Sequence, residues 1–314
     1  RRVPAGPAGA NTTRGGTMSL ISSIVVGVDF SPSCASALRE ALRIAQWNRA
    51  PVRAVHVIDT IVAAELGDAL SSLQTNVRDA LTADARAAWQ TFAATVPGAD
   101  AVAIDVRIDQ RVRGILAAAA DAKADLLVLG AFGDRRPDVG LGSVATNCVR
   151  HGSSRVLIVR DNQPGAFRRV VAAVDFSPTS LRALDQAARI ATQDSAELHV
   201  LHAFRAPWHD LHYRAPTLGT DPAFQTQYRA GLERRLHAFA AELGRETGFL
   251  KPTFALIDDA GHRSAIVDYA TRVDADLVVL GTRGRSNLRD ILLGSTAEKV
   301  LRDSPCSVLA IRPE

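Results

Sequence analysis

The chain contains few aromatic residues, which make up 5% of its 314 positions. Much of its apolar content is instead alanine, valine and leucine. Such a composition suits helices packed on a buried sheet better than a stacking surface for bases or sugars. Apolar residues make up 47% and charged residues 22%, which excludes the low hydropathy and high charge of a disordered chain.

Cysteine is also scarce, and its positions show neither disulfide nor metal spacing. The three residues lie far apart and form no C-x-x-C motif, so we expect no disulfide framework and no structural zinc site. Free thiols suit a reducing compartment, and we therefore expect a cytoplasmic protein. The residues are Cys34, Cys148 and Cys306, of which Cys306 is predicted to be a small buried apolar residue.

No apolar run is long enough for a membrane span, which needs about 18 consecutive apolar residues. The longest candidate, 114–132, is interrupted by Asp121, Lys123 and Asp125. The segment 1–17 has no apolar core of the kind that a secretory signal requires. We therefore expect no membrane partner.

The segment 1–17 is predicted to be a disordered tail or an added remnant, because the only methionine, Met18, follows it. A native disordered extension is the alternative. This tail carries +3 of the formal net charge of +4, through Arg1, Arg2 and Arg14. The remainder is almost neutral, so the pI near 9.3 does not indicate a nucleic-acid partner.

The rest of the chain is an internal repeat. VVGVDFSPS at 25–33 recurs as VAAVDFSPT at 171–179, with six of nine residues identical. ADLLVLG at 124–130 recurs as ADLVVLG at 275–281, with six of seven identical. A period near 150 residues is too long for a solenoid unit and indicates a duplicated domain. The predicted domains are 18–162 and 165–314, joined by a short linker.

Each copy alternates short apolar runs with longer helical patterns. Strands that are apolar on both faces and separated by helices are typical of a parallel sheet covered on both sides. Each copy is therefore predicted to be a doubly wound, Rossmann-like α/β domain. A Ser-Pro pair after the first strand predicts a helix start, because serine caps the first turn and proline fits its first position. The predicted strands are 24–29, 52–57, 101–107, 126–129 and 155–160, then 170–175, 197–203, 252–257, 277–280 and 307–312.

A glycine-rich segment after the fourth strand of the second copy carries the most informative pattern. Gly281 and Gly284 are followed, after nine residues, by Gly294 and Ser295. Glycines let backbone amides approach a phosphate chain, and a helix that begins at Gly294 directs its free amides and positive dipole end at the same anion. The positive charges of this segment are Arg283, Arg285 and Arg289.

Asp175 lies at the end of the first strand of the same copy. In a doubly wound sheet, ligands bind beyond the carboxyl ends of the strands, at the switch point between the first and fourth strands. Asp175 would face the glycine segment there and accept hydrogen bonds from ribose hydroxyls. Alternatively, Asp175 caps the following helix and the glycines form plain turns. The agreement of the aspartate, both glycine groups and the helix start favours a nucleotide site.

This combination, with a histidine near the end of the second strand, resembles the universal stress protein family in its tandem two-domain form. The resemblance covers 18–314 and implies two five-stranded parallel sheets of order 3-2-1-4-5, similar to adenine nucleotide alpha hydrolases. It also implies ATP as the ligand, with or without Mg²⁺, and pairing through strand five, as a pseudo-dimer of the two domains or as a homodimer. The implied contacts are Asp175 with ribose, the backbone near Ala203 and Leu280 with adenine, and Gly281, Arg283, Gly284, Gly294, Ser295 and Thr296 with the phosphates.

The first copy keeps the pattern with a shorter spacer of eight residues. This spacer contains Asp134 and Asp138 and has no net charge, whereas the second spacer carries +1. Carboxylates repel a triphosphate, so we expect the second domain to bind ATP better and the first to hold a weaker or degenerate site. The residues of that first site are Asp29, Val57, Gly130, Gly133, Gly142 and Ser143.

The histidines are predicted to be structural. His199 and His202 are three residues apart on a strand, so their side chains point to opposite faces and do not suit a metal pair. His56 and His202 recur at the same place in the two copies, as expected for a histidine with a structural hydrogen bond. His209 and His212 lie in a proline-rich stretch, which we expect to be a solvated insertion or a lid over the second site.

These features predict an ATP-binding protein with a regulatory role in the stress response. Neither copy contains the GK[ST] of a Walker loop or a catalytic triad. Arg283 and Asp290 are the only local charged candidates for a hydrolytic role, so we expect no turnover or only slow hydrolysis. Two alternatives remain: a nucleotide-free interaction module, and an adenylyl-transfer enzyme, which needs an acceptor pocket.

Overall fold

The computed structural model describes residues 21–69, 76–133, 142–160, 165–210, 221–243, 251–258, 262–284 and 293–313. Its first half contains β1 (Ile24–Val28), α1 (Pro32–Asn48), β2 (Val52–Asp59), α2 (Thr60–Ala69), α3 (Val77–Ala93), β3 (Ala103–Asp109), α4 (Arg111–Asp121), β4 (Leu126–Gly130), α5 (Ser143–His151) and β5 (Arg155–Val159). Its second half contains β6 (Arg169–Ala173), α6 (Pro178–Asp194), β7 (Glu197–Phe204), the 3-10 helix η3 (Pro207–Asp210), α8 (Pro222–Ala241), β8 (Thr253–Asp258), α9 (His262–Arg272), β9 (Leu277–Gly281), α10 (Ser295–Asp303) and β10 (Ser307–Ile311).

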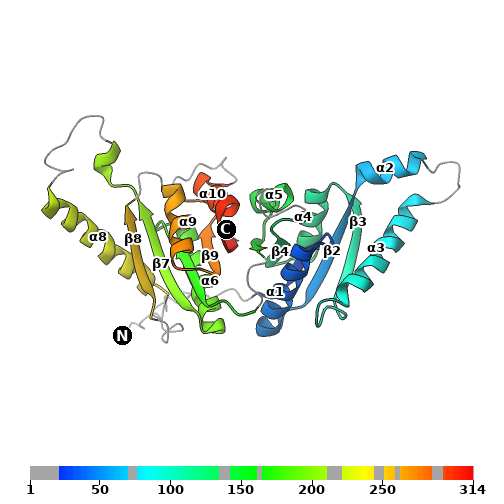
Figure 1. Cartoon of the computed structure of the whole chain (residues 1–314), viewed down its shortest axis with the longest axis horizontal. Coiled ribbons are helices and arrows are strands. Elements are labelled where there is room, and N and C mark those ends of the chain that lie inside the picture. The colour runs from blue at the N-terminus through cyan, green and yellow to red at the C-terminus, as the bar shows by residue number, and fades with distance from the viewer. Residues whose placement is uncertain are drawn as a thin grey trace, which may run out of the picture.

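The described strands form one sheet in the order β3-β2-β1-β4-β5-β10-β9-β6-β7-β8. Numbered within each half, the order is 3-2-1-4-5, and all neighbours inside a half are parallel. The outer strands β3 and β8 therefore lie at opposite ends of the molecule (Figure 1). The predicted fold class, two doubly wound α/β units, is confirmed.

The first helix of each half begins where the Ser-Pro pair predicts. Ser31 is the N-cap of α1, and its hydroxyl accepts a hydrogen bond from the amide of Cys34 at 3.2 Å. Ser177 caps α6 in the same way, accepting from the amide of Ser180 at 3.1 Å. The proline that follows each serine occupies the first turn, where no amide is needed.

Helices cover both faces of the sheet. Leu38 of α1 and Leu184 of α6 are fully buried on one face, in a cluster that also includes residues of α3 and α8. Residues of α4, α5, α9 and α10 form the cluster on the other face. The strands supply side chains to both clusters alternately, as Val25 and Val26 show. This two-sided burial explains why the strand sequences are almost continuously apolar.

The two halves join through an antiparallel pairing of β5 with β10. Leu157 lies opposite Leu309 in this register, with Ile158 opposite Val308. The strand-five edge of each half is thus occupied by the other half, so one long sheet runs through the chain. Among the described helices, none is long and apolar enough to span a bilayer.

Candidate functional site

Two cavities lie at the carboxyl ends of the central parallel strands, one in each half. The cavity of the second half has a volume of about 400 Å³, and that of the first half about 460 Å³. In the second half the predicted residues that line it are Asp175, Ala203, Leu280, Gly281, Arg283, Gly284, Gly294, Ser295 and Thr296. In the first half they are Asp29, Val57, Gly130, Gly133, Gly142 and Ser143. The fold thus brings both predicted sets together.

The aspartate of each cavity lies against the second glycine of its loop. A Cβ atom on Gly284 would stand 2.7 Å from Oδ2 of Asp175, and one on Gly133 would stand 2.8 Å from Oδ2 of Asp29. Such approaches are closer than a carbon and an oxygen atom tolerate. Glycine is therefore required at this position so that the loop can lie beside the carboxylate.

The other carboxylate oxygen holds the start of the following helix. Oδ1 of Asp175 accepts a hydrogen bond from the amide of Ser177 at 3.0 Å. Oδ1 of Asp29 accepts from the amide and the hydroxyl of Ser31, at 3.1 and 2.6 Å. The N-cap residues themselves are the serines, so Asp175 is not the cap of α6, although it accepts a hydrogen bond from the amide of the cap residue Ser177. The aspartate instead orients its second oxygen towards the cavity-lining glycine.

A strained phenylalanine follows each aspartate. Phe30 and Phe176 both have φ of 63°, a left-handed conformation that is costly for a residue with a Cβ atom. The ring of Phe176 packs on His202 with centroids 4.3 Å apart. Nδ1 of His202 in turn donates to the carbonyl of Val174 at 2.8 Å.

The first half repeats the arrangement, with Phe30 packed on His56 and Nδ1 of His56 at 2.8 Å from the carbonyl of Val28. The structural role predicted for His56 and His202 is confirmed. Both histidines therefore hold the turn that carries the aspartate through a hydrogen bond to the backbone of the preceding strand.

The helix that begins beside each glycine loop has a glycine as its N-cap. Gly294 is the N-cap of α10 and Gly142 is the N-cap of α5, and within the described residues neither helix start has a side-chain cap. The amide of Gly294 donates to the carbonyl of Thr282 at 2.8 Å, which closes the loop against the helix start. Gly294, Ser295 and Thr296 also line the cavity, so an anion bound there would lie at the start of α10, where the first-turn amides have no partner within the helix.

One residue of the second cavity, Thr282, was not predicted from the sequence. The hydroxyl of Thr282 is buried and has no hydrogen-bond partner within the part of the chain that the structure describes, and the same holds for Nε of Arg283. Buried polar atoms normally have partners, so both atoms are suited to a bound ligand. The first half has Ala131 and Phe132 at these positions, and this difference between the copies is the signal that would have identified Thr282.

Acidic and basic side chains differ between the two cavities. Asp29, Asp59 and Arg111 line the first, where Arg111 lies 3.4 Å from Asp59. Asp175 and Arg283 line the second. The described lining of the first cavity is therefore more negative by one charge than that of the second, because two carboxylates face one guanidinium there.

Several predicted residues lie outside the described part of the chain: Arg285, Arg289, Asp290, His212 and the spacer 134–141. The described start of the proline-rich stretch packs Trp208 edge-on against Tyr228 of α8 and does not line the second cavity. His199 hydrogen-bonds Tyr269 at 2.8 Å. Within the described residues, no cluster of three or more histidine, cysteine or acidic side chains is suited to a metal ion.

The doubly wound halves, the aspartate turn and the glycine loop beside an uncapped helix define an α/β protein of the nucleotide-binding type. The family model of the universal stress protein family matches residues 21–160 and again 166–312, and the chain belongs to this family.

The relatives extend over both halves. A universal stress protein of Mycolicibacterium smegmatis is 26% identical over 306 residues, which cover 92% of this chain and 97% of that protein. A solved universal stress protein from Archaeoglobus fulgidus covers 92% of this chain and 98% of its own, with 19% identity and a TM-score of 0.63. A universal stress protein solved in complex with cAMP is 28% identical, covers 47% of this chain and 98% of its own, and has a TM-score of 0.33.

Proposed function

We propose that this protein is an adenine-nucleotide-binding regulator of the stress response, with its principal site for ATP in the second half. The observation that carries the proposal is the convergence of three groups on one cavity. The carboxylate of Asp175, the glycine loop at Gly281–Gly284 and the uncapped start of α10 all line it. A ribose needs a hydrogen-bond acceptor such as the carboxylate, and a phosphate chain needs the backbone amides of the loop and the helix start.

The adenine base is assigned to the apolar end of the cavity. Leu280, Ala203, Leu201 and Ile266 line that region. Small and aliphatic side chains of this kind leave a flat slot, and backbone groups near Ala203 and Leu280 supply polar contacts to the base. The ribose hydroxyls then reach Asp175, whose oxygen Oδ2 lies beside Gly284.

The phosphates are assigned to the loop and the helix start. The first-turn amides of α10, the hydroxyl of Ser295 and the guanidinium of Arg283 surround this end of the cavity. Oγ1 of Thr282 and Nε of Arg283, which have no hydrogen-bond partner among the described residues, fit a bound phosphate as additional donors. Mg²⁺ would accompany the phosphates from solvent, because no cluster of acidic side chains in the described residues is suited to hold it.

The first half is proposed to bind the same ligand more weakly. It keeps the cavity, the aspartate and the uncapped helix, but Ala131 and Phe132 replace the two donors. The second carboxylate, Asp59, also lies on the lining and repels a polyanion.

The protein is proposed to bind ATP without efficient turnover. Fast phosphoryl transfer needs a placed metal ion, a group that orients water and stabilisation of the transition-state charge. Arg283 supplies only the last of these. An adenylyl-transfer enzyme is a less favoured second candidate, since it also needs an acceptor pocket. Sustained turnover above about 1 s⁻¹, the low end of ordinary enzymes, would contradict this proposal.

Two observations support the proposed location and assembly. The cysteines are buried and free, which supports a reducing cytosol as the compartment. The strand-five edges pair with each other inside the chain. A homodimer of this chain would therefore use another surface, and the intrachain pair takes the place of the family dimer.

A thermal-shift titration with Mg-ATP tests the nucleotide site. The unfolding temperature is expected to rise with ATP concentration, because a ligand that binds only the folded state stabilises it. The double variant Gly284→Val with Gly294→Val should lose the larger part of the shift. A shift that survives both changes would contradict the site, and no shift in the unchanged protein would favour a nucleotide-free interaction module.

A further inference from the structure

The loop of each nucleotide cavity is hydrogen-bonded to the end of the last strand in its own half. In the second half, the amide of Thr282 donates to the carbonyl of Ile311 in β10 at 2.8 Å. In the first half, the amide of Ala131 donates to the carbonyl of Val159 in β5 at 3.0 Å. Thr282 and Ala131 both line their cavities. Each cavity is therefore connected to one of the two strands that join the halves.

The residue that follows each of these carbonyls is an arginine that contacts the other half. Nη1 of Arg312 donates to the carbonyl of Arg150, in the last turn of α5, at 3.1 Å. Nη2 of Arg160 donates to the carbonyl of Arg302, in the last turn of α10, at 3.2 Å. The last carbonyls of a helix have no partner within it, so a cation is favourable there. Each half thus holds the carboxyl end of the other half's last helix.

Both of these helices begin at a nucleotide cavity. The first three residues of α5, 143–145, line the first cavity, and the first three of α10, 295–297, line the second. The helices lie side by side at the middle of the molecule (Figure 1), where Nη2 of Arg150 is 3.3 Å from Glu298. Each contains nine residues and is about 13 Å long. A helix this short moves as a unit, so its two ends do not shift independently.

The two arginines also lie near residues that line the cavity of their own half. The guanidinium of Arg160 lies over the ring of Phe132, 4.9 Å from the ring centroid, and Phe132 lines the first cavity. Arg283 has the equivalent position in the second copy and lines the second cavity. Burial lowers the pKa of Arg312, and the positive charge of Arg283 lowers it further. The two guanidiniums therefore repel each other, and a phosphate beside Arg283 would offset this repulsion.

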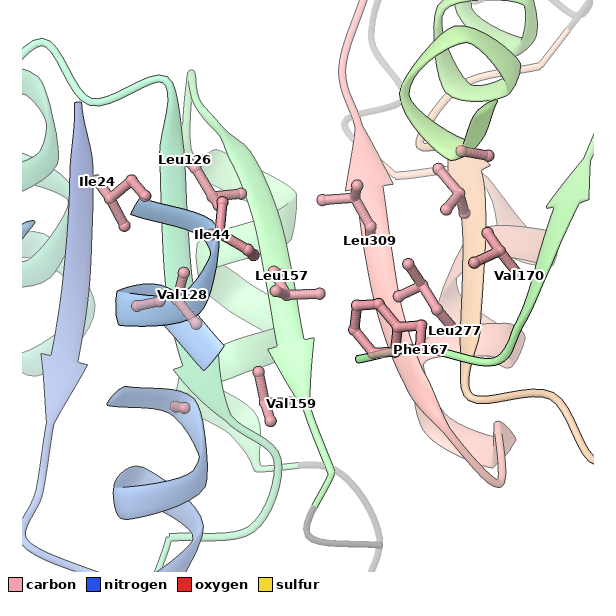
Figure 2. Close-up of a cluster of buried hydrophobic side chains, with 14 of the residues drawn as sticks. Ile24, Ile44, Leu126, Val128, Leu157, Val159, Phe167, Val170, Leu277 and Leu309 are labelled. Carbon is pink, nitrogen blue, oxygen red and sulfur yellow. The ribbon is translucent and has the colours of Figure 1, made fainter. Parts of the chain in front are cut away.

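Buried side chains fix the strand ends between the loops and the arginines. Val159 and Ile311, whose carbonyls accept the loop amides, are both buried. Figure 2 shows Val159 at the end of β5, beyond Leu157 and Leu309, which are paired across the seam between the halves. Close-packed interiors transmit a displacement rather than absorb it. A shift of either loop should therefore reach the arginine that follows the strand.

We propose that the two nucleotide cavities are coupled through Arg160 and Arg312, so that ATP in the second cavity raises the affinity of the first cavity for ATP. The proposal rests on the function proposed above and concerns the regulation of those sites. Phosphate beside Arg283 strengthens the hold of Arg312 on the end of α5, and the start of α5 lies at the first cavity. Linkage requires an equal effect in the reverse direction, through Arg160 and α10. We expect a coupling of about fivefold or more, the lower end of allosteric effects.

Isothermal titration of Mg-ATP into the full chain separates the two binding events. The tighter event fills the second cavity while the first is empty, so its affinity does not include the coupling. The weaker event takes place with the second cavity filled, so its affinity includes the coupling in full. Arg160→Met with Arg312→Met should therefore reduce the affinity of the weaker event about fivefold or more, and that of the tighter event less than about twofold.

Two further pairs of substitutions separate coupling from a general effect of lost charge. Arg160→Lys with Arg312→Lys keeps a cation at each helix end and should retain most of the coupling. Arg39→Met with Arg302→Met is the matched control, because both side chains are exposed and each bonds a residue of its own helix. This control should change the affinity of the weaker event less than about twofold.

Hydrogen exchange tests the coupling without a ligand in the first cavity and without a substitution at the joint. ATP at a concentration that saturates only the tighter event should slow amide exchange in α5, although α5 belongs to the half whose cavity is empty. Amide exchange in α3 of the same half should not change. Asp175→Ala should abolish the effect on α5 at this concentration, because the second cavity is then no longer filled.

The outcomes separate this proposal from the proposed function. Two ATP binding events with the same affinities in the unchanged chain and in the methionine pair would overturn the coupling and leave the nucleotide sites in place. A single binding event, or α5 exchange that does not respond to ATP in the second cavity, would also overturn the coupling alone. Absence of any ATP binding would contradict both proposals. If the methionine pair shows no cooperative thermal transition, the lysine pair and the exchange measurement decide.

Discussion

Nη1 of Arg312 donates to the carbonyl of Val149 at 3.2 Å, so the last strand of the second half reaches the end of α5 in the first. The mirror contact is present as well, because Nη2 of Arg160 donates to the carbonyl of Leu301 in α10 at 3.4 Å. Each arginine directly follows strand five of its own half and bonds the carboxyl end of the other half's last helix. A cation is favourable there, since the free carbonyls give that end a partial negative charge.

Replacing Arg312 by methionine should therefore loosen the joint between the halves. Hydrogen bonds to charged groups contribute about 1.5 to 3 kcal/mol, so Arg312→Met should lower the free energy of unfolding by about that amount. Urea denaturation followed by circular dichroism measures it. Arg302→Met is the matched control: Arg302 lies on the exposed surface beside Asp303, and an exposed ion pair contributes little, so its loss should cost far less than that of Arg312. An equal decrease in the free energy of unfolding in the two variants would contradict a special role for Arg312 in joining the halves.

Gly284→Ala should displace Asp175 and reduce nucleotide binding. The new Cβ atom would stand 2.7 Å from the carboxylate, so the loop or the aspartate must move. We expect a smaller ATP-dependent rise in unfolding temperature than in the unchanged protein. Gly67→Ala is the control, because no atom lies within 4 Å of its Cβ position in α2. That change should stabilise the helix by about 0.5 to 1 kcal/mol and leave the ATP shift intact.

The sequence predicts the fold of each half well, because strand and helix signals are local and occur twice. The Ser-Pro helix starts at Ser31 and Ser177 show this clearly. The pairing of β5 with β10 was predicted only through the family resemblance, because the residues of an apolar strand do not indicate which strand its edge pairs with. The hydrogen bonds of Arg160 and Arg312 between the halves could not be predicted for the same reason, although an arginine after strand five recurs in both copies.

The site, too, could be predicted from the sequence only in part. The aspartates and glycines are visible as a spaced pattern, and the structure gathers them into two cavities. The left-handed Phe30 and Phe176 could not be predicted, because their strain is stabilised by contacts with histidines from another strand. The hydroxyl of Thr282 is identified as a candidate ligand contact only by its burial without a hydrogen-bond partner in the described residues. Whether the predicted residues hold ATP, and where the domain boundaries fall, stay predictions.

His199 should make stability fall at low pH. Burial lowers the pKa of His199 below 6.5, although Glu197 acts in the opposite direction. The unfolded chain takes up a proton at about pH 6.5 while the folded chain keeps the ring neutral, so the free energy of unfolding rises with pH between the lowered pKa and about 6.5.

Chemical denaturation at several pH values tests this. One titrating proton gives a slope of at most about 1.4 kcal/mol per pH unit. His199→Gln keeps a hydrogen bond to Tyr269 and removes the titrating ring, so its stability should depend less on pH in this window. Identical pH profiles for the variant and the unchanged chain would show that His199 does not contribute.

The three cysteines should be unreactive in the folded protein. Burial raises the pKa of Cys34 and Cys148 to about 12, and that of Cys306 to about 11. Very little thiolate is therefore present at pH 8, and the thiolate is the reactive form. Ellman's reagent should modify none of them in the native chain and all three in denaturant. Rapid modification of the native chain would contradict this burial.

Isothermal titration of ATP into the chain, with Asp175→Ala and Asp29→Ala as a matched pair, tests the central claim most directly. The unchanged protein should show a tighter binding event that Asp175→Ala weakens about tenfold, since a charge-assisted hydrogen bond to ribose is lost. Asp29→Ala should leave that event unchanged and affect only the weaker one. Absence of ATP binding, or a tighter event that responds to Asp29 and not to Asp175, would contradict the assignment of the principal site to the second half.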